Sequence, residues 1–452
     1  MKLIDTLKNV WKITELKDKI ILTLGLLLVY RFGAQVVLPG IDVSKLGGLA
    51  DSTGGGLLGL LNAFTGGAFA NASVFALGIM PYISASIVVQ LMGIAIPYLQ
   101  KLQKEGASGQ KKITQITRWL TIAICLVQAP GYLASLPALS GVSSTSALLV
   151  GGFSTTSFMV SSVIILVTGC VFAMWLGEKI TDKGIGNGIS LLIMVGIIAR
   201  MPASFVQNYA SRIEGGGNGG LMMILIELVI WMLIILASIM LVMAVRKIAV
   251  QYARRTASGG YEKNVFGSRQ FLPLKLNASG VMPIIFAQAI MFVPSLIGKS
   301  FGDSTVGIWM QTQFADIFGF WYNVVFALLI IVFTYFYTAI TVPTNKMADD
   351  LKRSGGFIPG IRPGSETSEY LDKIMSQITL PGSIFLALIA VFPAIVVRIL
   401  GTQQGWALFF GGTSLLIMVG VAIDTMQQVN SYLLNKHYDG LMKTGKNRKA
   451  VA

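Results

Sequence analysis

The stretch "ALGIMPYISASIVVQLMG" at residues 76–93 is apolar enough for a membrane, yet it carries serine, tyrosine and glutamine. Isoleucines recur in it at a spacing of four: Ile79, Ile83 and Ile87. At about 100° per residue, Ser86 and Gln90 fall on the same side of a helix as these isoleucines. Because polar groups facing lipid are costly, this side is expected to meet an aqueous vestibule next to a narrow apolar constriction. The alternative is ordinary helix packing, in which isoleucine at this spacing is common.

Pro81 lies near the start of the same stretch. Proline has no N–H, so it would free the carbonyl near Leu77 from a helical hydrogen bond. We therefore expect a bend where this segment enters the membrane, as suits a gate helix.

The amino-acid composition indicates whether the protein is surrounded by water or by lipid. Of 452 residues, 54% are hydrophobic and only 12% are charged, and the mean hydropathy is +0.71. So little charge predicts a membrane protein that crosses the bilayer several times. The first 19 residues are amphipathic and lysine-rich and lead into a full-length apolar segment, so no cleavable signal peptide is expected. Cys125 and Cys170 lie in apolar segments without a CxxC partner, which favours small core residues over a disulfide or a zinc site.

Stretches of about 20 apolar residues predict the spans. Ten candidates emerge: 20–38, 73–95, 119–137, 157–177, 187–203, 221–244, 280–297, 321–341, 378–397 and 406–424. Most of the 35 Lys and Arg residues fall on one side of this arrangement, which by the positive-inside rule places both termini in the cytoplasm.

Two long basic loops, 245–279 and 342–377, lie on the predicted cytoplasmic side. "RKIAVQYARR" at 246–255 has helical spacing, and Ser365 or Thr367 is expected to cap a helix that follows the Pro-Gly turns around Arg362. Their length and turns favour docking of a cytosolic partner, with ribosomal RNA as a subsidiary reading. Loops that only set topology or touch anionic lipid are the alternative.

The segment 54–73, "GGGLLGLLNAFTGGAFANAS", avoids water but is too short to cross a bilayer. Irregular backbone at membrane depth must be surrounded by protein or line a water-filled cavity. A re-entrant half-helix that fills a cavity from outside meets this requirement. A helix lying on the outer leaflet meets it nearly as well.

Ionisable residues are scarce in the predicted spans. Arg31, Arg200, Glu227 and Arg398 fall towards the outer ends, where they are expected to snorkel or pair. Without a relay of buried Asp, Glu or His, an ion-coupled carrier or an intramembrane hydrolase is disfavoured. "GIGNG" at 184–188 follows no strand, which favours a flexible turn into a span over a nucleotide loop.

Four motifs together resemble the bacterial SecY family of protein-conducting channels almost end to end. They are "FALGIMPYISASIVVQL" (75–91), "MWLGEKITDKGIGNGIS" (174–190), "GFIPGIRPGSET" (356–367) and "FGGTSLLIMVGVAID" (410–424). The resemblance implies an all-α integral membrane protein of ten transmembrane helices. These form two pseudo-symmetric five-helix halves, 1–215 and 216–452, around a central hourglass pore with a re-entrant plug half-helix.

The resemblance also implies the site residues. The pore ring maps onto Ile79, Ile83, Ile189, Ile193, Ile285 and Ile417. The plug corresponds to about 57–71, with Leu57, Leu58, Leu60, Leu61, Asn62, Phe64, Thr65, Gly66 and Gly67 as its named residues. The lateral gate is lined by Ile87 and Gln90, and partners dock at Arg254, Arg255 and Arg362.

The implied activity is passage of unfolded polypeptides across the bacterial cytoplasmic (inner) membrane, with sideways release of hydrophobic segments. The implied partners are SecE, SecG, the SecA motor or the ribosome, signal peptides and nascent chains, and membrane lipid including anionic lipid. No cofactor, metal or catalytic residue is expected, since a partner supplies the energy. The loop 255–273 departs from the family pattern, and Arg269 is expected to replace a displaced docking contact. A small-solute transporter with broken helices is the alternative function.

Overall fold

The structure is a computed structural model that describes residues 11, 13–46, 56–142, 145–150, 154–214, 220–252, 269–278, 280–291, 294 and 305–448. The chain forms two compact units. The first comprises residues 1–217, 403–409 and 421–452, and the second comprises 218–402 and 410–420.

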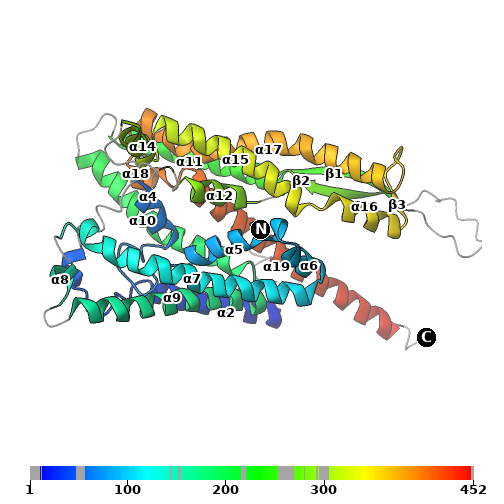
Figure 1. Ribbon diagram of the computed structural model, residues 1–452. Helices are drawn as coiled ribbons and strands as arrows, with labels where there is room; N and C mark the ends of the chain where they lie inside the picture. Colours follow the sequence, from blue (N-terminus) through cyan, green and yellow to red (C-terminus); the bar gives the residue numbers. More distant parts are fainter. Residues whose placement is uncertain are drawn as a thin grey trace, which may run out of the picture. The chain divides into compact units, whose positions relative to one another are not determined.

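The first unit is helical. Its helices are α2 (Thr14–Gly33), η1 (Val43–Leu46), α4 (Gly56–Phe64), α5 (Met80–Ala95), α6 (Pro97–Lys104), α7 (Ala107–Ser140), α8 (Thr145–Leu148), α9 (Thr155–Lys183), α10 (Gly188–Glu214), α18 (Gln404–Ala407) and most of α19 (Gly412–Arg448). Helix α7 packs between α5 and α9 (Figure 1), and α9 also contacts α2 and α10.

Glycines allow the closest of these helix contacts. A Cβ on Gly188, at the start of α10, would lie 2.0 Å from the carbonyl oxygen of Gly177 on α9. A Cβ on Gly169 of α9 would lie 2.3 Å from the carbonyl oxygen of Val74. Since backbone atoms cannot rotate away as a side chain can, these two positions fix how α9 meets its neighbours.

The second unit combines helices with a small sheet. Its elements are α11 (Gly220–Met243), β1 (Val245–Tyr252), β2 (Arg269–Lys275), α12 (Met282–Ile290), α14 (Thr305–Ala315), α15 (Phe320–Thr341), α16 (Thr344–Arg353), β3 (Gly356–Phe357), α17 (Ser365–Leu400) and the first residues of α19. Helix α15 packs against both α12 and α17, and α11 packs against α17.

The two long basic loops fold together into this sheet. Its strand order is β2-β1-β3, both pairs are antiparallel, and Ile248 lies opposite Leu272. Figure 1 shows the sheet beside α16 and the first turns of α17. A shared apolar core joins these elements: Ile248, Val250, Leu274, Leu351, Ile358, Leu371, Met375 and Ile378.

The helix expected over 246–255 is therefore wrong: residues 245–252 form a strand. Ile248 and Val250 are both buried, while the residue between them is more exposed. That alternation has the period of a strand, and β-branched residues favour it. A partner strand 17 residues further along the chain, β2, decides the outcome and is invisible to a local helical reading.

The bend expected at Pro81 is also wrong. Helix α5 begins at Met80, so Pro81 lies in its first turn, where a missing N–H costs nothing. The residues from 65 to 79 form turns, so the helix starts at Met80, just before Pro81, and does not bend there.

Among the described residues, seven helices are long and apolar enough to cross a membrane. They are Ser108–Pro137, Thr155–Lys183, Gly188–Ile213, Gly220–Met243, Phe320–Arg353, Ser365–Leu400 and Gln404–Leu434. An eighth is added if Met80–Gly93 and Pro97–Gln103, bent by 101°, count as one span. The mostly helical, multi-pass membrane fold is thereby confirmed, whereas the count of ten spans stays a prediction.

Candidate pore lining and plug

The start of α5 carries the isoleucine stripe. Ile79 is the N-cap of the helix, and its carbonyl accepts the N–H of Ile83 at 3.1 Å, so the stripe runs unbroken into the helix. Ile79 and Ile87 are buried, and Ile83 is half-buried. The stripe is thus partly covered within the protein, while Ile83 keeps open surface.

Polar groups lie beside this stripe, as the sequence predicts. Gln90 donates a hydrogen bond from Nε2 to Ser86 Oγ at 3.3 Å. Both side chains are half-buried, and one turn separates them along α5. The predicted gate residues Ile87 and Gln90 therefore lie on the same helix as Ile79 and Ile83.

Helix α10 carries two more of the predicted ring residues. Ile193 is buried, and Ile189 is half-buried with its Cγ1 next to Gly177 of α9. The tight contact at Gly188 fixes the first turn of α10 and with it the position of Ile189.

The plug segment, residues 57–71, consists of the short helix α4 and the turns that follow it. Asn62 and Thr65 hold these turns together: the N–H of Gly67 donates to the Asn62 carbonyl, that of Ala70 to Asn62 Oδ1 at 3.1 Å, and that of Phe69 to Thr65 Oγ1 at 3.2 Å. Both side chains are buried. The polar residues that interrupt the apolar run thus satisfy the backbone where the helix ends.

The plug segment lies against both isoleucine-bearing elements of the first unit. A Cβ on Gly66 would lie 2.7 Å from Cα of Gly196, one turn after Ile193 on α10. A Cβ on Gly78, the residue before Ile79, would lie 3.0 Å from Cγ2 of Thr65. Gly66 has a φ of 66° and Gly78 a φ of 54°, so glycine is required there for conformation as well as for space.

Arg31 contributes a contact that the sequence did not reveal. From the last turn of α2, its Nη1 donates a hydrogen bond to the carbonyl oxygen of Gly66 in the plug segment. A bond from a charged donor is stronger than a neutral one, and more so away from water. A lone arginine near a span end predicts snorkelling, because nothing in the sequence marks a carbonyl 35 residues away as its acceptor.

Tyr132 anchors the residues at the end of the plug segment. Its hydroxyl donates to the carbonyl of Phe69 at 2.8 Å, and the two rings pack with centroids 4.9 Å apart. Two backbone bonds continue this anchoring, from Leu38 N to Ala72 O and from Val74 N to Val36 O, each 2.9 Å long.

The remaining ring residues lie in the second unit. Ile285 on α12 is half-buried, and Ile417 on α19 is buried. A ring that combines them with Ile79, Ile83, Ile189 and Ile193 stays a prediction.

Glu227 differs from what its place in the sequence suggests. It is 1% exposed on α11 and accepts a hydrogen bond from the Thr402 hydroxyl at 2.9 Å. The expected pairing is confirmed, but the carboxyl group is enclosed by protein and does not snorkel. One buried acid bonded to a hydroxyl does not make a proton relay.

Arg362 projects from the loop between β3 and α17. Its side chain is 88% exposed, with one guanidinium nitrogen 3.8 Å from Glu366.

Helix α17 is capped by Gly364, so the expected caps Ser365 and Thr367 are wrong. The Thr367 hydroxyl instead donates to the Arg362 carbonyl at 2.8 Å. With a φ of 121° at Gly364, glycine suits a cap that other residues would strain.

The other docking candidates, Arg254 and Arg255, lie outside the described residues. Tyr252, two residues before Arg254, pairs with Gly356 in the sheet, on the loop that leads to Arg362. Arg269 begins β2.

Solved structures identify the class of fold. "The structure of a protein conducting channel" matches with a TM-score of 0.58 at 16% identity over 91% of each chain. "Sec61 in the Canine ribosome-channel complex from the endoplasmic reticulum" matches with a TM-score of 0.54 at 16% identity, again over 91% of each chain. The fold is the multi-pass helical membrane fold of these two solved structures.

Sequence relatives identify the family. The SecY family profile matches residues 73–426. "Protein translocase subunit SecY" of Streptomyces scabiei is 38% identical over 96% of this chain and 98% of its own length. The protein of the same name from Mycobacterium tuberculosis is 40% identical over 95% of this chain and 97% of its own. The chain belongs to the SecY family, and the resemblance seen in the motifs is confirmed.

The first prediction concerns the hydrogen bond from Arg31 to the carbonyl oxygen of Gly66. Replacing Arg31 with methionine keeps much of the apolar stem but removes a charged hydrogen bond worth about 1.5–3 kcal/mol. The plug segment should then leave its place more often, and single-channel recordings of the reconstituted protein should show a higher resting ion conductance.

Lys45→Met is the matched control, because Lys45 also donates to a backbone carbonyl, that of Ala147, but outside the plug segment. It should leave the conductance at the wild-type level. Equal conductance in Arg31→Met and wild type would contradict a retaining role for this bond.

Proposed function

We propose that this chain is the channel subunit of a protein translocase, through which unfolded polypeptides cross a membrane and hydrophobic segments leave sideways into lipid. One observation carries the proposal: the plug segment packs at Gly196 and Gly78, directly beside the elements that bear Ile193 and Ile79. A short helix with no span of its own, seated next to branched apolar side chains, is suited to close a passage lined by them. Membership of a family whose relatives are named protein translocase subunits agrees with this, and a small-solute carrier is not favoured.

In the proposed mechanism, the isoleucines Ile79, Ile83, Ile189, Ile193, Ile285 and Ile417 form a ring that fits around an extended chain. Such a ring limits ion leakage by close fit and dewetting and needs no charge. The plug segment seals the ring at rest. The two halves, 1–215 and 216–452, would part at a lateral gate lined by Ile87 and Gln90, where a hydrophobic stretch of about 20 residues partitions favourably into lipid.

The proposed setting is the cytoplasmic (inner) membrane of a bacterium, with both termini inside. SecE is proposed to clamp the halves, with SecG peripheral, and SecA or the ribosome is proposed to dock on the basic loops and supply the work. The exposed guanidinium of Arg362 and the shared core under the sheet support a firm docking platform there. Anionic lipid near these loops would add attraction for the same basic residues.

A disulfide experiment tests the function directly. A single cysteine replaces Ile83 in a background without Cys125 and Cys170, and the protein is reconstituted with SecE and SecA. A secretory precursor with its own cysteine is then stalled during transport. We expect an ATP-dependent cross-link that moves along the precursor as the stall length changes. A precursor that is protected inside vesicles without any cross-link would place the path on another face.

Replacing Ile83 and Ile285 with serine should widen and wet the constriction. Resting ion conductance should rise by about tenfold, since dewetting depends on apolar, close-fitting walls. Val127 on α7 is an exposed apolar residue outside the proposed ring, and Val127→Ser should have no effect. Conductance that stays at the wild-type level in the double variant would remove these two residues from the ring.

Charge reversal of Arg362 should slow SecA-driven transport several-fold without unfolding the protein, because the side chain contacts mainly solvent. The measure is precursor import into vesicles, alongside thermal unfolding in detergent. Lys112→Glu on α7, also exposed but outside the two basic loops, controls for the general loss of positive charge. Full transport by Arg362→Glu would end the docking assignment.

A further inference from the structure

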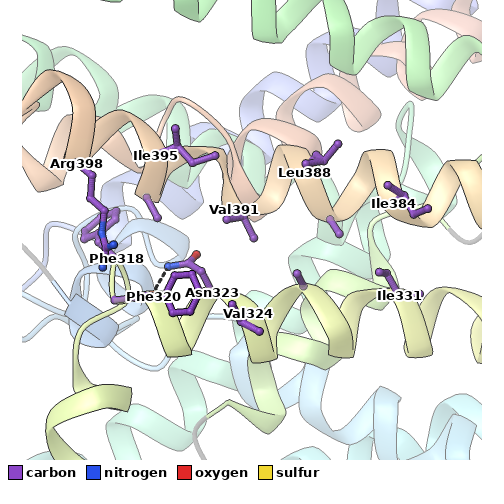
Figure 2. Close-up of a pocket in the computed structure, with 14 residues that line it drawn as sticks. Phe318, Phe320, Asn323, Val324, Ile331, Ile384, Leu388, Val391, Ile395 and Arg398 are labelled. Carbon is purple, nitrogen blue, oxygen red and sulfur yellow. Dashed lines mark hydrogen bonds between the residues drawn. The ribbon is translucent and has the colours of Figure 1, made fainter.

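An apolar groove of about 410 Å³ runs between α15 and α17. Figure 2 shows Arg398, Phe318 and Asn323 near one end and Ile331 and Ile384 at the other. Large apolar side chains on both walls, including Val324 and Leu388, are exposed, so the groove opens to the surroundings of the unit. In a multi-pass membrane protein such an opening on two spans faces hydrocarbon.

Arg398 places a positive charge at one end of this groove. It lies in the last turn of α17, is exposed, and forms no ion pair or hydrogen bond with any residue that the structure describes. Its proximity to the helix C-terminus is favourable, but a guanidinium carries five N–H donors, which remain to be satisfied. An anion at this end of the groove would meet that need.

Asn323 adds a second polar group at the same end. Its amide nitrogen donates to the carbonyls of Ile317 and Gly319, at 2.8 and 2.7 Å (Figure 2). These bonds leave its carbonyl oxygen as an acceptor and fix the turn that leads into α15. The groove therefore has an apolar body, and these two polar side chains lie at one end of it.

The dimensions suit an acyl chain. From Ile384 to Arg398, α17 rises by about 21 Å, while half of the hydrocarbon core measures about 15 Å. A chain that starts at the level of Arg398 would thus reach the middle of the bilayer within the groove.

We propose that this groove binds a membrane phospholipid, with one acyl chain between α15 and α17 and the phosphate on the guanidinium of Arg398. Arginine pairs with phosphate through two parallel hydrogen bonds, so the head group supplies the anion that none of the described residues provides. In the topology proposed above, Arg398 lies on the outer side, and the lipid belongs to the outer leaflet. None of the proposed pore residues lines the groove, so the lipid would be bound whether or not polypeptide is passing.

Photolabelling tests this site on the full chain, reconstituted without precursor or motor. The probe is phosphatidylglycerol with a diazirine in one acyl chain, compared with a diacylglycerol that carries the same chains but no phosphate. We expect phosphatidylglycerol to label residues on α15 and α17 at the groove, and diacylglycerol to label them about tenfold less, because a charged hydrogen bond is lost.

Variants decide whether Arg398 is responsible. Arg398→Gln should lower groove labelling about tenfold, Arg398→Lys should restore part of it, and Arg246→Gln on β1 should leave it unchanged. Equal labelling by both probes, or labelling that ignores Arg398, would reduce the occupant to adventitious bulk lipid and overturn the proposal.

A second measurement separates lipid from protein. A benzoylphenylalanine in place of Leu388 should cross-link to a lipid-sized adduct when the protein is irradiated in its native membrane. A protein-sized adduct would mean that a partner helix covers the groove and would also overturn the proposal. Neither readout needs transport activity, so a failed channel assignment would not be mistaken for a failed lipid site.

Discussion

The hydrogen-bonding demand of irregular backbone in a membrane is the constraint on which the first unit depends. Between the end of α4 and the start of α5, the chain makes turns for some 15 residues, most of them buried, where water cannot replace lost hydrogen bonds. Asn62, Thr65 and Ser73 satisfy these turns from within, and Tyr132 satisfies them from α7. The polar residues that interrupt an otherwise apolar sequence are therefore what permits it to be buried.

Two kinds of contact hold this segment, and they differ in consequence. Residues 69–74 are tied by Tyr132 and by backbone bonds to residues 36 and 38. The turn at Gly66 is held by the Arg31 bond and by its close approach to Gly196. Close glycine contacts gain dispersion energy over a small area, so they can be lost and regained without exposing a large apolar surface. In the proposed plug, the firmly tied residues would stay while α4 moves about the glycines at 66 and 67, whose φ values are 66° and 92°.

The fold could be predicted from the sequence where the signal is local and continuous. Apolar runs of span length give most of the membrane helices, and four motifs give the family. The isoleucine stripe at Ile79, Ile83 and Ile87 likewise needs only a helical period. Prediction from the sequence was wrong where a partner distant in the chain determines the local structure. Residues 246–252 form a strand because β2 and β3 pair with them. Pro81 lies in the first turn of a helix because the preceding residues are held in turns by contacts elsewhere.

Charged residues also show that local sequence does not predict which partner a side chain reaches. Arg31, Glu227 and Arg398 look alike in sequence: each is a single charge near the outer end of an apolar segment. In the structure the three side chains have three different environments. Arg31 donates to the plug segment, Glu227 is enclosed with Thr402, and Arg398 stays exposed at the end of an apolar groove. A hydropathy scale assigns each of the three charged side chains an unfavourable free energy of transfer into the membrane. The actual free energy depends on the partner that each side chain reaches. The first two are compensated within the protein. The third is left for the membrane to compensate, and a phosphate at the level of the head groups is the anion that every phospholipid bilayer offers.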